Sequence, residues 1–173
     1  AGVTGILVGF EQFDVDKPDN ILASDVLAQV VTLHSISGLF LVVLPLLLGL
    51  ALAVVPLQLG ASTVAFPRAA AASYWGFLVG GALMLAGYAA NGGPYGGEAD
   101  GVALFVAAFV LLLVALSTAA VCVATTVVAL RAPGMALHRT PLFSWSMLVA
   151  GTIWLLTLPV LAGLMVLAHV DLQ

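Results

Sequence analysis

The sequence predicts an all-α integral membrane protein whose four transmembrane helices form a bundle. Three observations support this fold class. Hydrophobic residues make up 63% of the chain and charged residues only 7%, with a mean hydropathy of +1.23, whereas about a quarter of a soluble domain is charged. The apolar residues gather into four long runs, and the acidic and basic residues lie in different connecting segments. Apolar runs of this length must be helices, because a lone strand cannot satisfy its backbone in lipid.

The four apolar runs define the predicted transmembrane domain, residues 26–173. They cover residues 26–57, 72–90, 101–130 and 141–169. Each is long enough to cross a hydrocarbon core of about 30 Å, which needs about 20 helical residues. The runs contain no Asp, Glu, Lys or Arg. Because pumps and transporters carry such residues within the membrane, the chain is not expected to be a self-contained pump.

Residues 1–25 are predicted to form a separate acidic segment on the outer face. The first ten, AGVTGILVGF, are apolar but too few to span a membrane, so we expect the stub of a helix there. Residues 11–25 hold five acids and Lys17, and Pro18 and Asn20 interrupt any regular periodicity. We therefore expect this part to be solvated.

The distribution of charge predicts the orientation of the helices. The loop after the first run and the loop after the third hold Arg68, Arg131 and Arg139, whereas the opposite face holds all eight acids and only Lys17. The positive-inside rule then places both chain ends on the outer face.

The four basic residues of the chain are too few for nucleic-acid binding, which depends on neutralising many phosphates.

Small residues, prolines and hydroxyls give local expectations within the spans. Gly76 and Gly80 form a small-xxx-small pair, which predicts a close helix neighbour. Pro45 and Pro159 each remove a helical hydrogen bond, which predicts a bend. Five hydroxyl side chains in the spans are expected mainly to hydrogen-bond to helix backbones, and the alternative is that they line a polar path through the bundle. They belong to Thr118, Thr125, Thr126, Ser144 and Ser146.

His34 is the main candidate functional residue because it lies inside an apolar run, whereas His138 and His169 lie at span ends. An imidazole in the membrane requires a partner. A hydrogen bond to another helix is one possibility. The other is a cofactor or metal, since a neutral imidazole is a good axial ligand for haem iron and a helical bundle can host a porphyrin. No paired-cysteine, histidine-rich or glycine-rich phosphate motif is present.

The order of several short motifs resembles subunit I of cytochrome c oxidase, a haem-copper oxidase. The resemblance covers about residues 32–167 and corresponds to the second through fifth membrane helices of a truncated or split form of that subunit. It implies the same orientation as the charges. The motifs are His34, Pro45, VPLQLGA from Val55, AFPR from Ala65, Ser73-Tyr74-Trp75, TTVVALRAPGM from Thr125, RTPLFSW from Arg139 and LPVLAG from Leu158.

The resemblance implies that His34 is an axial ligand of a low-spin haem, of unspecified type, which another chain can share. Ser35, Ser37 or a nearby carbonyl would orient its ring. The family takes its copper ligands and remaining haem ligands from later helices, so the resemblance implies no copper site and no catalytic residue here. His169 is a shallower candidate for the second haem ligand. The family's proton-entrance acid and asparagines are replaced by Thr63 and the alanines at 69–72.

Two functions follow as expectations. In the first, the chain is a subunit I-like component of a respiratory membrane complex and contributes to electron transfer to oxygen only with other chains, which the retained His34 favours. In the second, it is a non-catalytic scaffold or assembly subunit, which the lost acid and asparagines favour. Neither makes the isolated chain an enzyme. Its expected partners are lipid and other oxidase subunits, in a bacterial or archaeal cytoplasmic membrane in preference to the mitochondrial inner membrane.

Overall fold

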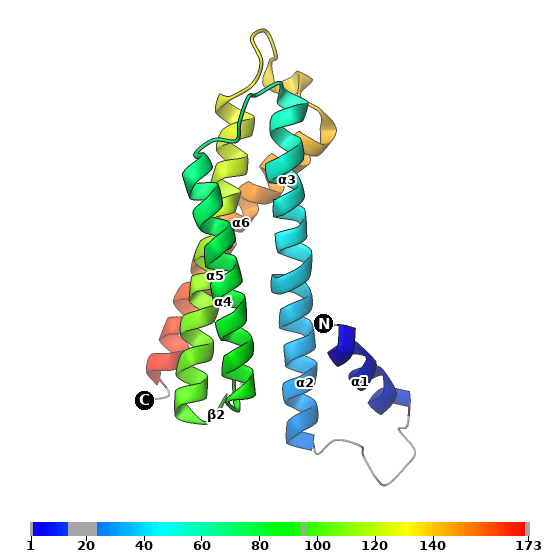
Figure 1. Cartoon of the computed structure of the whole chain (residues 1–173), viewed down its shortest axis with the longest axis vertical. Helices are drawn as coiled ribbons and strands as arrows, with labels where there is room; N and C mark the ends of the chain where they lie inside the picture. The colour runs from blue at the N-terminus through cyan, green and yellow to red at the C-terminus, as the bar shows by residue number, and fades with distance from the viewer. Residues whose placement is uncertain (1, 14–23, 95, 172–173) are drawn as a thin grey trace.

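The computed structural model describes residues 2–13, 24–94 and 96–171, and they form an all-α bundle (Figure 1). Four helical segments are long and apolar enough to cross a membrane, which confirms the predicted fold class: Val26–Leu59, Pro67–Ala89, Ala99–Ala129 and Leu142–Asp171. The helices are α1 (Gly2–Phe13), α2 (Ser24–Ile36), the π-helical segment η1 (Ser37–Val43), α3 (Leu44–Leu59), α4 (Pro67–Ala89), α5 (Ala99–Ala129), the 3₁₀ turn η2 (Leu137–Arg139) and α6 (Leu142–Asp171).

The first span is a continuous rod made of α2, η1 and α3, and its irregularity lies just before Pro45. Proline has no N–H, and its ring clashes with the carbonyl four residues earlier, here that of Leu41. The chain accommodates Pro45 by widening into η1, so that the N–H of Leu44 donates to the carbonyl of Leu39, five residues back. The sequence predicted a bend at Pro45, and the structure has a π-helical segment immediately before this residue. Helix α6, by contrast, continues through Pro159.

Gly60 and Pro67 determine where α3 ends and α4 begins. Gly60 takes a left-handed conformation (φ 67°), and the N–H of Ala61 donates to the carbonyl of Pro56, which closes α3 with a Schellman motif. Pro67 occupies the first turn of α4, where its fixed φ suits a helix start. The second span was predicted to begin at residue 72, but α4 begins five residues earlier. The alanines at 69–72 are good helix formers, so the helix that starts at Pro67 continues through them.

Helix α5 is the centre of the bundle, with α4 and α6 packed along it. Its side chains supply most of the core, including Phe105, Leu112 and Val123. Phe109 joins this core to the first span through an edge-to-face contact with Phe40 of η1, at 5.0 Å between ring centroids. The α4–α5 contact is close because glycines line it. A Cβ added at Gly80 would lie 3.0 Å from the backbone nitrogen of Leu112, which confirms the predicted close helix neighbour.

The connections between spans gather at the two ends of the bundle (Figure 1). At one end, the N–H of Ala132 donates to the carbonyl of Leu59 at 2.9 Å, so the α3–α4 and α5–α6 connections lie side by side. At the other end, β1 (Gly92–Gly93) and β2 (Gly96–Gly97) form a short antiparallel ladder between α4 and α5.

The N-terminal apolar stretch is a helix that contacts α2, and it lies beside the lower half of the first span in Figure 1. Helix α1 extends to Phe13, so the segment predicted to be solvated from Glu11 begins inside a helix. Its 12 residues span about 18 Å, which is too short to cross a bilayer alone. The rest of the predicted acidic segment, residues 14–23, lies outside the described residues.

Candidate functional site around His34

His34 lies in the last turn of α2, immediately before the π-helical segment. The side chain is partly buried. The backbone hydrogen-bond register changes just after it, and π-helical turns are often found at functional sites. The imidazole thus lies three residues before the segment in which the first span departs from regular α-helix.

Thr4 of α1 is the residue that meets the imidazole of His34. The Thr4 Oγ1 and His34 Nδ1 atoms are 3.2 Å apart, in a partly buried hydrogen bond between residues 30 positions apart in the chain. The hydroxyl can either donate or accept, so it matches both neutral forms of the ring. The hydrogen bond to another helix that the sequence left as one possibility for His34 is therefore present.

Gly5 brings the backbone of α1 against the same ring. A Cβ placed on Gly5 would lie 2.9 Å from His34 Cε1 and 3.4 Å from Nδ1. The first of these distances is shorter than real Cβ contacts, so a side chain at this position would push the imidazole away. The absence of a Cβ at Gly5 is what lets α1 approach closely enough for Thr4 to reach Nδ1.

The serines beside His34 bond to the backbone. Ser35 Oγ donates to the carbonyl of Val31 at 3.0 Å, and Ser37 Oγ donates to the carbonyl of His34 itself at 3.3 Å. These hydroxyls brace the end of α2, whereas the ring contact comes from Thr4. Sequence reasoning missed Thr4 because it considered only partners near His34 in the chain. The AGVTG stretch carried no signal that it would fold back onto α2.

One imidazole backed by a hydroxyl fits one axial position of a haem iron, since metal-bound histidines usually donate their other N–H to such a partner. A complete haem or copper site needs further donors. Among the described residues, no group of three or more His, Cys, Asp or Glu side chains could hold a metal ion. His169, the candidate second ligand, lies in the last turn of α6, and Figure 1 shows that end of α6 across the α4–α5 pair from α2. The structure therefore does not bring His34 and His169 together.

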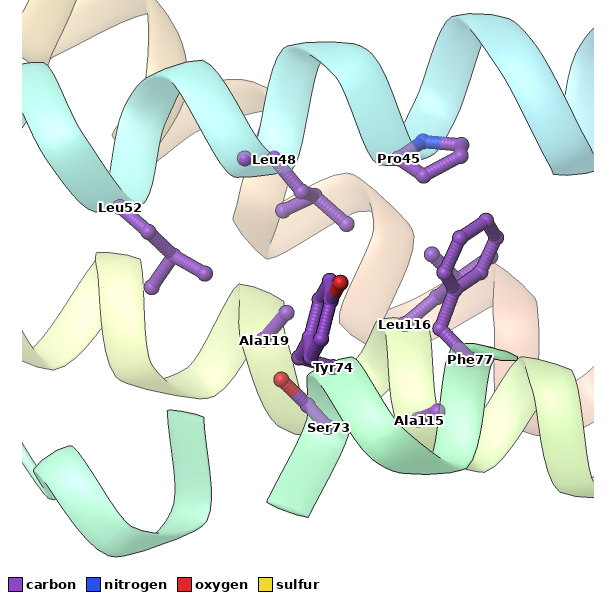
Figure 2. A pocket seen from close by; sticks show the side chains of 10 residues that line it. Pro45, Leu48, Leu52, Ser73, Tyr74, Phe77, Ala115, Leu116 and Ala119 are labelled. Atoms are coloured by element: carbon purple, nitrogen blue, oxygen red, sulfur yellow. The ribbon is translucent and has the colours of Figure 1, made fainter. Parts of the chain in front are cut away.

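A small apolar cavity lies further along the first span, between α3, α4 and α5 (Figure 2). Pro45, Leu48 and Leu52 line one side of it, and Tyr74 and Phe77 line the other. Its volume is about 70 Å³, whereas ligand pockets typically occupy about 300 Å³ or more. The cavity is thus a packing gap beside the short alanines of α5, and it is too small to hold a cofactor.

The end of the bundle that carries the arginines holds several buried polar contacts. Thr126 accepts the N–H of Ala65 at 2.8 Å and donates to the carbonyl of Cys122 at 2.6 Å. Ser144 donates to Gln58 Oε1 at 2.7 Å, which links α6 to α3. Arg131 donates to the carbonyl of Val127 at the end of α5. Hydroxyl bonding to helix backbones is confirmed for Thr118, Thr126 and Ser146, whereas Ser144 bonds to a side chain.

The whole chain, residues 1–173, matches the protein family described as Cytochrome C and Quinol oxidase polypeptide I. Cytochrome c oxidase subunit 1 of Bacillus subtilis is 32% identical over 181 residues, which cover 98% of this chain and 29% of that protein. The protein of the same name from Cereibacter sphaeroides is 35% identical over 115 residues, covering 57% of this chain and 20% of its own length. A probable cytochrome c oxidase subunit 1-beta of Nocardia farcinica is 35% identical over 112 residues, which cover 56% of this chain and 19% of that protein.

These matches confirm the resemblance that the motifs indicated. They also show that the chain spans between about a fifth and three tenths of the length of these relatives. The four long apolar helices and the bacterial relatives together identify an integral membrane protein. The chain therefore belongs to the Cytochrome C and Quinol oxidase polypeptide I family, of which it contains a four-helix portion.

Proposed function

We propose that this chain forms part of a respiratory oxidase and that His34 supplies one axial ligand to a low-spin haem. The observation that carries the proposal is the placement of His34 within an otherwise apolar span, with Nδ1 hydrogen-bonded to Thr4. The ring atom offered to iron is then Nε2. The membership of the chain in the oxidase family supports the same role.

Bound at this place, a low-spin haem would accept and pass on single electrons. Among the described residues, no group of three or more donors could hold a metal ion, and His169 lies in the last turn of α6, which Figure 1 shows across α4 and α5 from α2. We therefore propose that the second haem ligand and the oxygen-reducing centre come from other chains or segments, and that electron transfer to oxygen occurs only in the assembled complex. The partners would be other membrane subunits of a respiratory oxidase.

The same proposal includes a location and an orientation. The curated relatives named above are bacterial, which favours a bacterial cytoplasmic membrane, with an archaeal one as the alternative. The end of the bundle that holds Arg68, Arg131 and Arg139 would face the cytoplasm, because positively charged loops are retained on that side. The beginning of α2 and the end of α6 would then lie at the outer face.

The first test replaces the proposed ligand. In the purified complex, His34→Ala should abolish the low-spin haem band of the reduced optical spectrum, because the substitution removes a bond to iron. His138→Ala is the matched control, since His138 is an exposed histidine in the η2 turn, and it should leave the band unchanged. A His34→Ala complex that keeps its low-spin band, or a parent complex without haem, would contradict the ligand role.

A scaffold function is the second candidate, and the hydrogen bond between Thr4 and His34 favours it. That bond gives His34 a structural role in joining α1 to α2 without any cofactor. The absence of an acid between Gly60 and Phe66 is also in keeping with this role, since exposed Thr63 is found there. In this case His34→Ala should cost about 0.6–2 kcal/mol of stability, the range for a hydrogen bond between membrane helices, and should leave any haem spectrum intact.

A further inference from the structure

Helix α1 is shaped to fit the imidazole of His34. Thr4, Gly5, Val8 and Gly9 form its less exposed side, whereas Val3, Ile6, Leu7 and Phe10 are exposed. On the less exposed side, the Thr4 hydroxyl hydrogen-bonds to the His34 ring. Gly5 has no side chain, which leaves room for the same ring. The two adjacent residues thus restrain the imidazole in different ways.

The hydrogen bond also restrains where the ring carries its proton. A neutral imidazole has one N–H, and a ring that binds iron through Nε2 must carry its proton on Nδ1. At 3.2 Å, that N–H can donate to Thr4 Oγ1. An acceptor at Nδ1 fixes the orientation of a ligating ring and increases its basicity. Thr4 would therefore influence the electron density that His34 donates to iron.

We propose that Thr4 is the positioning residue for His34, and that it sets the orientation and donor strength of the haem ligand. This inference rests on the proposed function. The serines nearest in sequence donate to the carbonyls of Val31 and His34, whereas Thr4 provides a side-chain contact to Nδ1. Gly5 keeps the gap between α1 and the ring narrow enough for that contact.

The test compares Thr4→Val with Thr4→Ser in the purified complex. Valine keeps the shape of threonine but cannot accept the Nδ1–H bond, whereas serine keeps the hydroxyl. Thr4→Val should shift the low-spin haem band and raise the midpoint potential of that haem, because a less basic ligand stabilises ferric iron less. Thr4→Ser should keep the band position and the midpoint potential close to those of the parent. Thr152→Val is the matched control, since Thr152 is exposed on α6 and its hydroxyl donates to the backbone carbonyl of Leu148.

A second pair of variants examines the close approach of α1. Gly5→Ala should lower the haem content or broaden the low-spin band, because the new Cβ would displace the ring. Gly9→Ala should change neither, since an added Cβ there meets nothing within 4 Å.

The possible outcomes separate this inference from the function on which it rests. A His34→Ala complex without the low-spin band, combined with unchanged band and potential in Thr4→Val, would overturn the positioning role and leave the ligand role standing. An unchanged low-spin band in His34→Ala would overturn both. A shift in Thr4→Val that Thr4→Ser does not reverse would also contradict the positioning role, because the hydroxyl would then not be its cause.

Discussion

At the scale of single residues, Thr126 shows how one hydroxyl can hold a loop against a membrane helix. Its side chain is 0% exposed, it accepts the N–H of Ala65, and it donates within its own helix. The loop between α3 and α4 has few regular hydrogen bonds, so the N–H of Ala65 depends on this contact. An unsatisfied buried N–H costs about 1–3 kcal/mol, which is more than the roughly 1 kcal/mol that an average hydrogen bond contributes.

Thr126→Val should therefore destabilise the protein by about 1–3 kcal/mol, because valine fills the same space and leaves the N–H of Ala65 without its acceptor. The measurement is the midpoint of unfolding in sodium dodecyl sulfate for the purified protein. Thr118→Val is the control on the same helix, since the Thr118 hydroxyl bonds to the Val114 carbonyl. Equal midpoints for the two variants would show that the Ala65–Thr126 bond contributes little.

Residue-level prediction from the sequence succeeded where the relevant contact is local and failed where it is distant. The hydroxyls of Thr118 and Ser146 bond to carbonyls four residues back, as helix geometry alone suggests. The Ser144 hydroxyl instead donates a hydrogen bond to Gln58, 86 residues away, and His34 is hydrogen-bonded to Thr4. Such pairs depend on which helices become neighbours, and the composition of a single span carries little information about that.

At the scale of helices, the α4–α5 pair depends on glycine for its close packing. A Cβ on Gly76 would lie 3.2 Å from that of Ala115, and one on Gly87 would lie 2.9 Å from the backbone nitrogen of Phe105. Helices in lipid gain no hydrophobic attraction for each other, so close packing of this kind provides much of their association energy. The small-xxx-small pattern predicted this contact because it requires only the residues of one helix.

Gly80→Leu should force α4 away from α5 and lower the recovery of folded protein several-fold, since overpacking costs about 1–3 kcal/mol or more. Gly163→Leu is the matched control. Gly163 is exposed on α6, and an added Cβ there meets nothing within 4 Å. Size-exclusion chromatography of both variants in detergent provides the comparison. Similar recovery of the monodisperse species would contradict the role of Gly80 in helix packing.

Helix boundaries were predicted less well than helix contacts. The apolar run predicted that the second span begins at residue 72, but α4 begins at Pro67. A hydropathy pattern marks where lipid would cover a helix, and a helix can extend beyond that region. Pro45 led us to predict a bend, but not that seven residues would adopt π-helical hydrogen bonding. Whether these residues form α-helical or π-helical hydrogen bonds depends also on packing, such as the contact of Phe40 with Phe109.

At the scale of the whole molecule, charge and topology agree. The α3–α4 and α5–α6 connections lie side by side through the Ala132–Leu59 hydrogen bond, and Arg131 and Arg139 lie in the second of them. Arg68 lies in the first turn of α4 at the same end. Glu98 and Asp100 lie at the opposite end, where α5 begins. The sequence could predict this separation because consecutive spans must alternate in direction.

The orientation in the membrane is the last prediction, and the structure determines where it can be tested. Gly97 is unsuitable for a cysteine because its φ is 132° and a Cβ would collide with the carbonyl of Asn91. Glu98 and Ser62 are both exposed. Glu98 caps the start of α5 and Ser62 follows the end of α3, and Figure 1 shows these two helix ends at opposite ends of the bundle. Cys122, the native cysteine, is buried and should not react.

With an impermeant thiol reagent added to intact cells, Glu98→Cys should be labelled and Ser62→Cys should be labelled only after the membrane is opened. The physical reason is that the arginines near Ser62 are retained on the cytoplasmic side, while acidic residues contribute little to orientation. The unsubstituted chain serves as the control for Cys122. Labelling of Ser62→Cys in intact cells, with Glu98→Cys protected, would show that the bundle is inserted in the opposite direction, and the α3–α4 connection would then face outward.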